Sequence, residues 1–259
     1  MMNNLSLDLI HAEQEASKII EKYGISSPKH IRLKDIAYDL GVDVLEGILK
    51  GAAGSLVRIG NNATIRVSND DLYEYRKRFS IAHELGHFVL NHGISIQRIC
   101  SDEDMMNWYK QSEEAEANFF AGELILPESI IKKRCDVAEV DFRPIKQIAH
   151  EFRASLTATS IRFVRFCPER CAVVFSKDAK VKWFYGSEDW RPFIRIGSKL
   201  DERTTAFDFF KGNILPDEPI EVGADAWVEG EGEGLGEIVE HSVGSKYLNF
   251  VLTILWIQP

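Results

Sequence analysis

His83 and His87 stand four residues apart, and Glu84 follows the first of them. In an α-helix each residue advances about 100° around the axis, so the two imidazoles would lie one turn apart on one face. Two neutral imidazole nitrogens suit Zn²⁺, and a neighbouring carboxylate can take a proton from a water that the metal activates. This His-Glu-x-x-His pattern predicts metal-assisted peptide hydrolysis.

The residues around the motif are typical of a buried helix. The apolar positions within 78–90 include Ile81, Leu85, Phe88 and Val89. Gly86 is small, so another backbone or a substrate could approach closely there. Buried polar groups without partners cost about 1–3 kcal/mol each, which favours a metal site over a chance match.

A site of this type needs a third protein ligand. Metzincins supply a histidine six residues after the second one, but that position is Gly93 here, so this class is excluded. His92 comes five residues after His87, about 140° further round the helix wheel at 3.6 residues per turn. We therefore expect His92 to flank the site rather than to bind the metal.

A second apolar helix, expected over residues 113–127, offers carboxylates instead. Its buried face has helical spacing and consists of Ala117, Phe120, Ala121 and Leu124. Glu114 and Glu113 project from that face one turn earlier, and the geometry favours Glu114 with Glu113 second. Glu116 and Glu123 are expected to point sideways into solvent.

Both motifs and their spacing resemble the ImmA/IrrE family of zinc metallopeptidases. The first motif runs from Arg78 to His87, and the second runs from Glu114 to Pro127. The resemblance covers residues 30–165. It implies a zincin-like α+β domain that cleaves a protein substrate, usually a helix-turn-helix transcriptional repressor, in stress, phage or mobile-element regulation.

The resemblance also implies residue roles of the gluzincin type. The zinc ligands would be His83, His87 and Glu114, and Glu84 would be the catalytic base that moves a proton from water to the leaving amine. Three protein ligands leave an open position on the metal. The same two-histidine, one-carboxylate set could also hold Mn²⁺.

The elements before the motif are expected to be two helices, a strand and a β-hairpin. Helical apolar spacing covers 7–23 and 31–40, and alternation indicates a strand over 42–45. The hairpin is expected at 55–67. Ordinary sheet pairing is the favoured use of its second strand, and the alternative is that Ile65, Arg66 and Val67 bind substrate at an exposed edge.

Residues 141–166 are predicted to form a helical pair that looks like a helix-turn-helix. Its basic residues are Lys146, Arg153, Arg162 and Arg165. Packing within the peptidase domain is the favoured interpretation, because Arg153 stands where a turn glycine is usual. The alternative function is a DNA- or partner-binding regulator with a non-catalytic metal site.

The character of the chain changes after Cys167. β-branched and aromatic runs at 171–176, 181–185, 193–196 and 246–257 predict a β-rich region, with a helix near 204–210. We therefore expect an α+β protein with a zincin-like domain over 1–166 and a β-rich domain over 167–259. The second domain would sense a signal or bind a partner or the substrate.

Composition limits the remaining possibilities. The chain has 259 residues, 45% of them hydrophobic, and a net charge of −9, which argues against direct nucleic-acid binding by the whole surface. Four scattered cysteines are too few for a disulfide framework, so reduced thiols are expected. A polar N-terminus and the lack of a long apolar run predict a cytoplasmic protein with no membrane segment.

Overall fold

The structure is a computed structural model, and it describes residues 6–49, 54–59, 62–69, 74–92, 97–100, 112–229, 234–246 and 248–258. It divides into two compact units. One unit runs to Ile130 and includes Ala149–Ser155, and the other comprises Ile131–Ile148 and Leu156–Pro259. By contrast, the division expected from the sequence lies at residue 166, where the chain changes from helices to strands.

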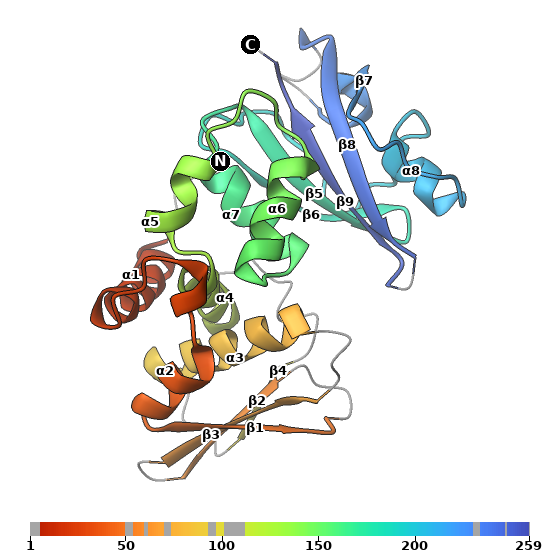
Figure 1. The fold of residues 1–259 in the computed structure, drawn as a ribbon. Helices are drawn as coiled ribbons and strands as arrows, with labels where there is room; N and C mark the ends of the chain where they lie inside the picture. The colour runs from red at the N-terminus through yellow and green to blue at the C-terminus, as the bar shows by residue number, and fades with distance from the viewer. Residues whose placement is uncertain are drawn as a thin grey trace. The chain divides into compact units, whose positions relative to one another are not determined.

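The first unit combines helices with a four-stranded sheet. Its elements are α1 (Leu7–Lys22), a 3-10 helix (Pro28–His30), α2 (Leu33–Asp39), β1 (Val42–Gly47), β2 (Gly54–Ile59), β3 (Asn62–Ser68), α3 (Glu74–Val89), β4 (Gln97–Cys100) and α4 (Glu113–Ile125). The strand order is β1-β3-β2-β4, with β1 parallel to β3 and the other pairs antiparallel (Figure 1). The helices, the strand and the hairpin expected from the sequence are all present.

The position of β3 decides between the two uses expected for this strand. β3 pairs with β1 on one side and with β2 on the other, so it is an interior strand. Ile65 and Val67 are fully buried, and only Arg66 between them points outward. Ordinary sheet pairing is therefore confirmed, and the alternative of an exposed edge at Ile65–Val67 is wrong, because both backbone edges of this strand already pair within the sheet.

Three helices pack one upon another, starting from this sheet. α3 contacts β2 and β3, α4 packs along α3, and α1 packs along α4. Serine side chains cap two of these helices, since the Ser6 Oγ accepts from the Leu9 amide at 3.4 Å and the Ser112 Oγ accepts from the Ala115 amide at 3.3 Å. The sheet thus supports α3 from one side while α4 covers it from the other.

The second unit contains a five-stranded antiparallel sheet. Its elements are α7 (Leu156–Phe166), β5 (Cys171–Lys177), β6 (Lys180–Gly186), α8 (Thr205–Phe210), β7 (Ile220–Gly223), β8 (Glu237–Ser245) and β9 (Phe250–Trp256), in the strand order β6-β5-β9-β8-β7. The unit also includes most of α6 (Phe142–Phe152), and α5 (Glu128–Ile131) precedes it.

The predicted helix near 204–210 is present as α8. The predicted strand at 193–196 is wrong, because this segment is irregular and makes one isolated bridge, from Phe193 to Glu229.

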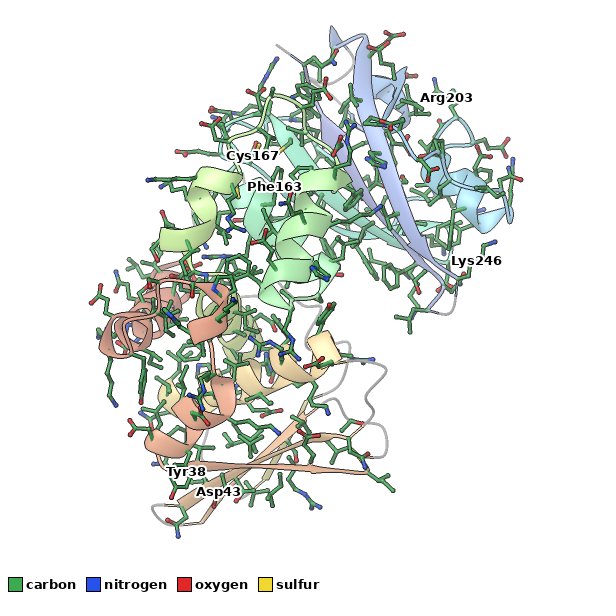
Figure 2. All side chains as sticks on the ribbon, viewed as in Figure 1. Tyr38, Asp43, Phe163, Cys167, Arg203 and Lys246 are labelled. Carbon is green, nitrogen blue, oxygen red and sulfur yellow. The ribbon has the colours of Figure 1, made fainter. Side chains whose placement is uncertain are left out.

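Cysteines of this unit lie in its interior. Cys135, Cys167 and Cys171 are free and buried, and Cys167 directly follows α7 (Figure 2). Burial raises the pKa of the Cys135 thiol to about 12, so this thiol is protonated at neutral pH.

Among the described residues, no helix combines the length and the apolar character needed to cross a bilayer.

A buried histidine links the β8 strand to the start of α6. The Phe142 amide donates to the Nδ1 atom of His241 at 3.2 Å, and the two rings pack edge to face. Burial lowers the pKa of His241 below its ordinary value because it disfavours the imidazolium. Protonation would replace the acceptor with a donor and place a positive charge at a helix N-terminus.

The stability of this unit should therefore depend on pH. At pH values between the lowered pKa of His241 in the folded state and its ordinary value of about 6.5, the unfolded chain binds more protons than the folded chain. The contribution of neutral His241 to the stability of the fold is fully present above about pH 6.5 and is lost as the pH falls through this window. We expect melting temperatures at about pH 7.5 and about pH 5.5 to differ less in His241→Gln than in the wild type. Equal differences would contradict this role.

Candidate metal centre

The middle of α3 is buried on all sides. Nine consecutive residues, from Phe79 to His87, are buried, and the exposed fractions of His83, Glu84 and His87 are 0%, 0% and 1%. The helix can enclose its polar residues because β2 and β3 lie against it on one side and α4 on the other. The motif thus forms a buried polar cluster within an apolar helix.

A glycine allows α4 to approach α3 closely. A Cβ atom added at Gly86 would lie 3.0 Å from the Phe120 Cδ1 and 3.2 Å from the Ala117 Cα. Any side chain at position 86 would therefore push against the backbone of α4. The close approach that the sequence indicated for Gly86 is made by α4, and it brings the first turn of α4 over the two histidines.

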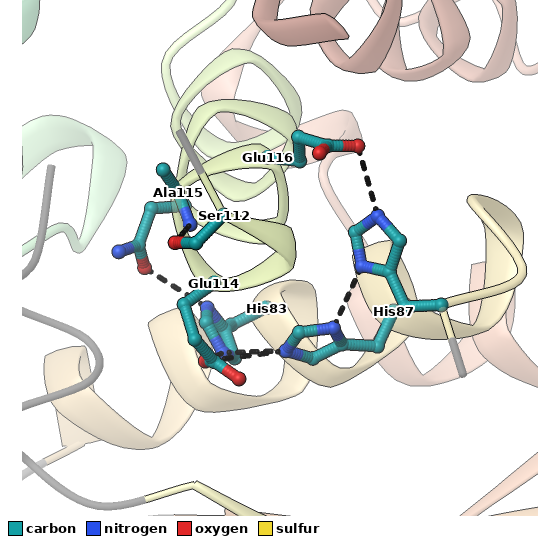
Figure 3. Close-up of polar contacts among 8 residues, drawn as sticks. His83, His87, Ser112, Glu114, Ala115 and Glu116 are labelled. Carbon is teal, nitrogen blue, oxygen red and sulfur yellow. Dashed lines mark hydrogen bonds and ion pairs between the residues drawn. The ribbon is translucent and has the colours of Figure 1, made fainter. Parts of the chain in front are cut away.

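Three ligand atoms converge at this point (Figure 3). The Nε2 atoms of His83 and His87 are 3.0 Å apart, and the Glu114 Oε2 lies 3.2 Å and 3.4 Å from them respectively. Around a tetrahedral Zn²⁺ with bonds of about 2.0–2.1 Å, neighbouring ligand atoms are about 3.3 Å apart. The spacing and the chemistry of this donor set therefore fit one zinc ion.

A side-chain amide sets the tautomer of His83. The Asn118 Oδ1 lies 2.9 Å from the Nδ1 of His83, and an amide oxygen only accepts. The proton of His83 must then sit on Nδ1, which leaves the Nε2 lone pair facing His87 and Glu114. Because Asn118 lies one turn after Glu114 on α4, one helix supplies both contacts.

A second histidine and a carboxylate stand behind His87. The Nδ1 atoms of His87 and His92 are 2.8 Å apart, and the His92 Nε2 lies 3.0 Å from the Glu116 Oε2. Figure 3 shows these contacts as a chain from His87 to α4. The expectation that His92 flanks the site is confirmed, whereas the expectation that Glu116 points to solvent is wrong.

Glu84 lies against a glycine of β2. A Cβ atom added at Gly54 would be 2.7 Å from the Glu84 Oε1 and 3.1 Å from its Cγ. The absence of a side chain at Gly54 thus leaves room for this carboxylate next to His83. Gly54 was missed by the sequence reasoning because nothing in the chain before the motif marks a strand glycine as its neighbour.

The candidate carboxylates of α4 lie in different environments. The carboxylate of Glu114 lies beside the two histidines of α3, while Glu113 is exposed to solvent. Glu123 was expected in solvent but is buried, with an exposed fraction of 6%, and accepts from the Ser17 hydroxyl and the Glu128 amide. Asn118 was also missed, although its position one turn after Glu114 was a usable signal.

Comparison with known proteins agrees with this architecture. A peptidase family model described as the IrrE N-terminal-like domain matches residues 37–164. Among solved structures, a Mycobacterium tuberculosis transcriptional regulator is similar, with a TM-score of 0.61 over 96% of this chain and 76% of that chain. Its sequence identity of 14% limits this likeness to the fold. No curated protein matches the chain.

The matched residues contain β2, β3, α3 and α4, and with them both halves of the metal centre. This match supports a metallopeptidase or regulator-related role. Residues 37–164 of the chain are thus similar to the IrrE N-terminal-like domain.

Proposed function

We propose that this protein is a zinc-dependent endopeptidase that cleaves a regulatory protein. The observation that carries the proposal is the convergence of His83, His87 and Glu114 within 4.8 Å of one another, with Glu84 buried beside them. These three residues would hold the metal, and the same donor set would accept Mn²⁺. A bound divalent metal supplies Lewis acidity towards a peptide carbonyl and makes a water more acidic.

The chain itself supplies the base and the orientation of the ligands. Glu84 is next to His83 in the sequence, on the helix that carries both histidines, so its carboxylate can hold the proton of the attacking water and pass it to the leaving amine. Asn118 keeps the proton of His83 on Nδ1. The packed apolar walls of α3 and α4 exclude bulk water, which strengthens the electrostatic interactions within the site.

A helix-turn-helix transcriptional repressor is the proposed substrate, and the family resemblance supports it. A cytoplasmic location would bring the enzyme to such a DNA-binding protein. The β-rich region over 167–259 is proposed to bind the substrate or another partner or to sense a signal, and the division into domains 1–166 and 167–259 stays a proposal.

DNA binding by the helical pair at 141–166 is less well supported. Arg162 is buried, with an exposed fraction of 2%, and its guanidinium lies 4.6 Å from the centre of the Phe166 ring. Arg153 adopts a left-handed conformation at the end of α6 and forms an ion pair with Glu74. Arg162 is therefore too buried to contact a phosphate, and Arg153 is exposed but its guanidinium is engaged by a carboxylate of the same chain.

Replacing the base should separate catalysis from metal binding. Glu84→Gln keeps the size of the side chain but removes the proton acceptor, so cleavage should fall by at least about 100-fold while zinc content is unchanged. The measurement is a survey of new protein N-termini in extract from the source organism, treated with zinc-loaded wild type or variant. New N-termini in a repressor with the wild type alone support the proposal. The same N-termini with both proteins, or none with the wild type, would refute it.

The strand glycine beside the base offers a second test. In Gly54→Ala the added Cβ would overlap the Glu84 carboxylate and displace it, so kcat on the identified substrate should fall by about 10- to 100-fold with zinc affinity retained. Gly47→Ala is the matched control in the same sheet, because a Cβ there meets no atom within 4 Å. Equal kcat values in the two variants would show that Gly54 does not position the base.

A further inference from the structure

We propose that His92 and Glu116 form a positioning pair, which fixes the proton of His87 on Nδ1 and presents its Nε2 to the metal. This inference rests on the proposed function, since it concerns how the same site holds its metal. The pair consists of two side chains from different elements that meet behind the ligand. Their exposed side-chain fractions are 6% for His92 and 22% for Glu116, so His92 is shielded from bulk solvent and Glu116 is partly buried.

The direction of the hydrogen bonds follows from the carboxylate. An ionised Glu116 can only accept, so the Nε2 of His92 donates to it over 3.0 Å. The Nδ1 of a neutral His92 then carries no proton and accepts from the Nδ1 of His87 over 2.8 Å. This arrangement leaves the Nε2 of His87 without a proton, as a metal ligand requires.

The end of α3 places His92 for this contact. The helix ends at Val89, and Asn91 adopts a left-handed conformation with φ of 54°. Asparagine tolerates this conformation better than most residues, and the chain then turns back so that the His92 amide donates to the His87 carbonyl at 3.1 Å. The two imidazole rings consequently lie edge to face, with their centres 5.0 Å apart.

The two ligand histidines are thus oriented in different ways by the same helix. His83 is held by the neutral amide of Asn118, whereas His87 is held through His92 by the charge of Glu116. A carboxylate behind an imidazole increases the basicity of the ligand nitrogen. Loss of such an outer partner typically weakens metal affinity by about 10- to 100-fold.

Three variants at the pair test the proposal. His92→Phe keeps an aromatic ring but removes the acceptor, so zinc affinity, measured by competition with a chromogenic chelator, should fall by about 10- to 100-fold. His92→Gln can still accept from His87 through its amide oxygen and should recover most of that loss. Glu116→Ala should give an intermediate loss. His150→Phe and Glu21→Ala, at exposed positions, are the matched controls and should bind zinc like the wild type.

A spectroscopic readout separates positioning from general damage to the fold. In zinc-loaded protein with ¹⁵N-labelled histidine, long-range ¹H–¹⁵N NMR should show the proton of His87 on Nδ1 in the wild type and in His92→Gln. Wild-type affinity in His92→Phe, equal losses in His92→Phe and His92→Gln, or a wild-type His92 that carries its proton on Nδ1 and none on Nε2 would overturn this inference alone. A wild type that binds no zinc would instead overturn the proposed function, and this inference with it.

Discussion

The contact between α3 and α4 is the constraint on which the candidate site depends. Gly86 has no side chain, so Ala117 and Phe120 of α4 can pack directly against the backbone of α3. Glu114 lies just before these residues, and this packing brings its carboxylate to the two imidazoles on α3. The sheet behind α3 keeps that helix in place, so the distances within the centre are determined by core packing rather than by mobile loops.

One helix supplies most of the polar surroundings. Glu114, Glu116 and Asn118 follow one another at every second position of α4, and they provide a candidate ligand, the carboxylate behind His92 and the amide on His83. Burying such groups costs about 1–3 kcal/mol for each that is left unpaired, whereas structural zinc sites bind with about 10–16 kcal/mol. A bound metal would therefore make this buried polar cluster favourable.

Sequence reasoning predicted those parts of the molecule that follow from local periodicity. The spacing of the motif and the apolar face of α4 were enough to select Glu114 over Glu113, and alternation was enough to predict the hairpin that contains β3. Sheet order could not be predicted, because pairing partners distant in the chain decide it, and so an exposed edge at β3 stayed open as an alternative to ordinary pairing. Glu116 and Glu123 were assigned to solvent because the position of a residue around the helix axis does not predict which other elements pack on that face. His92 covers the first of these faces and α1 covers the second.

The most direct test of the account is the zinc content of the purified protein. The wild type should contain about one zinc per chain, and Glu114→Ala should lose it, because two imidazoles alone do not complete a tetrahedral site. Glu21→Ala removes an exposed carboxylate of α1 and should keep the metal. A wild type without zinc after incubation with the metal, or a Glu114→Ala variant with wild-type zinc content, would contradict the account.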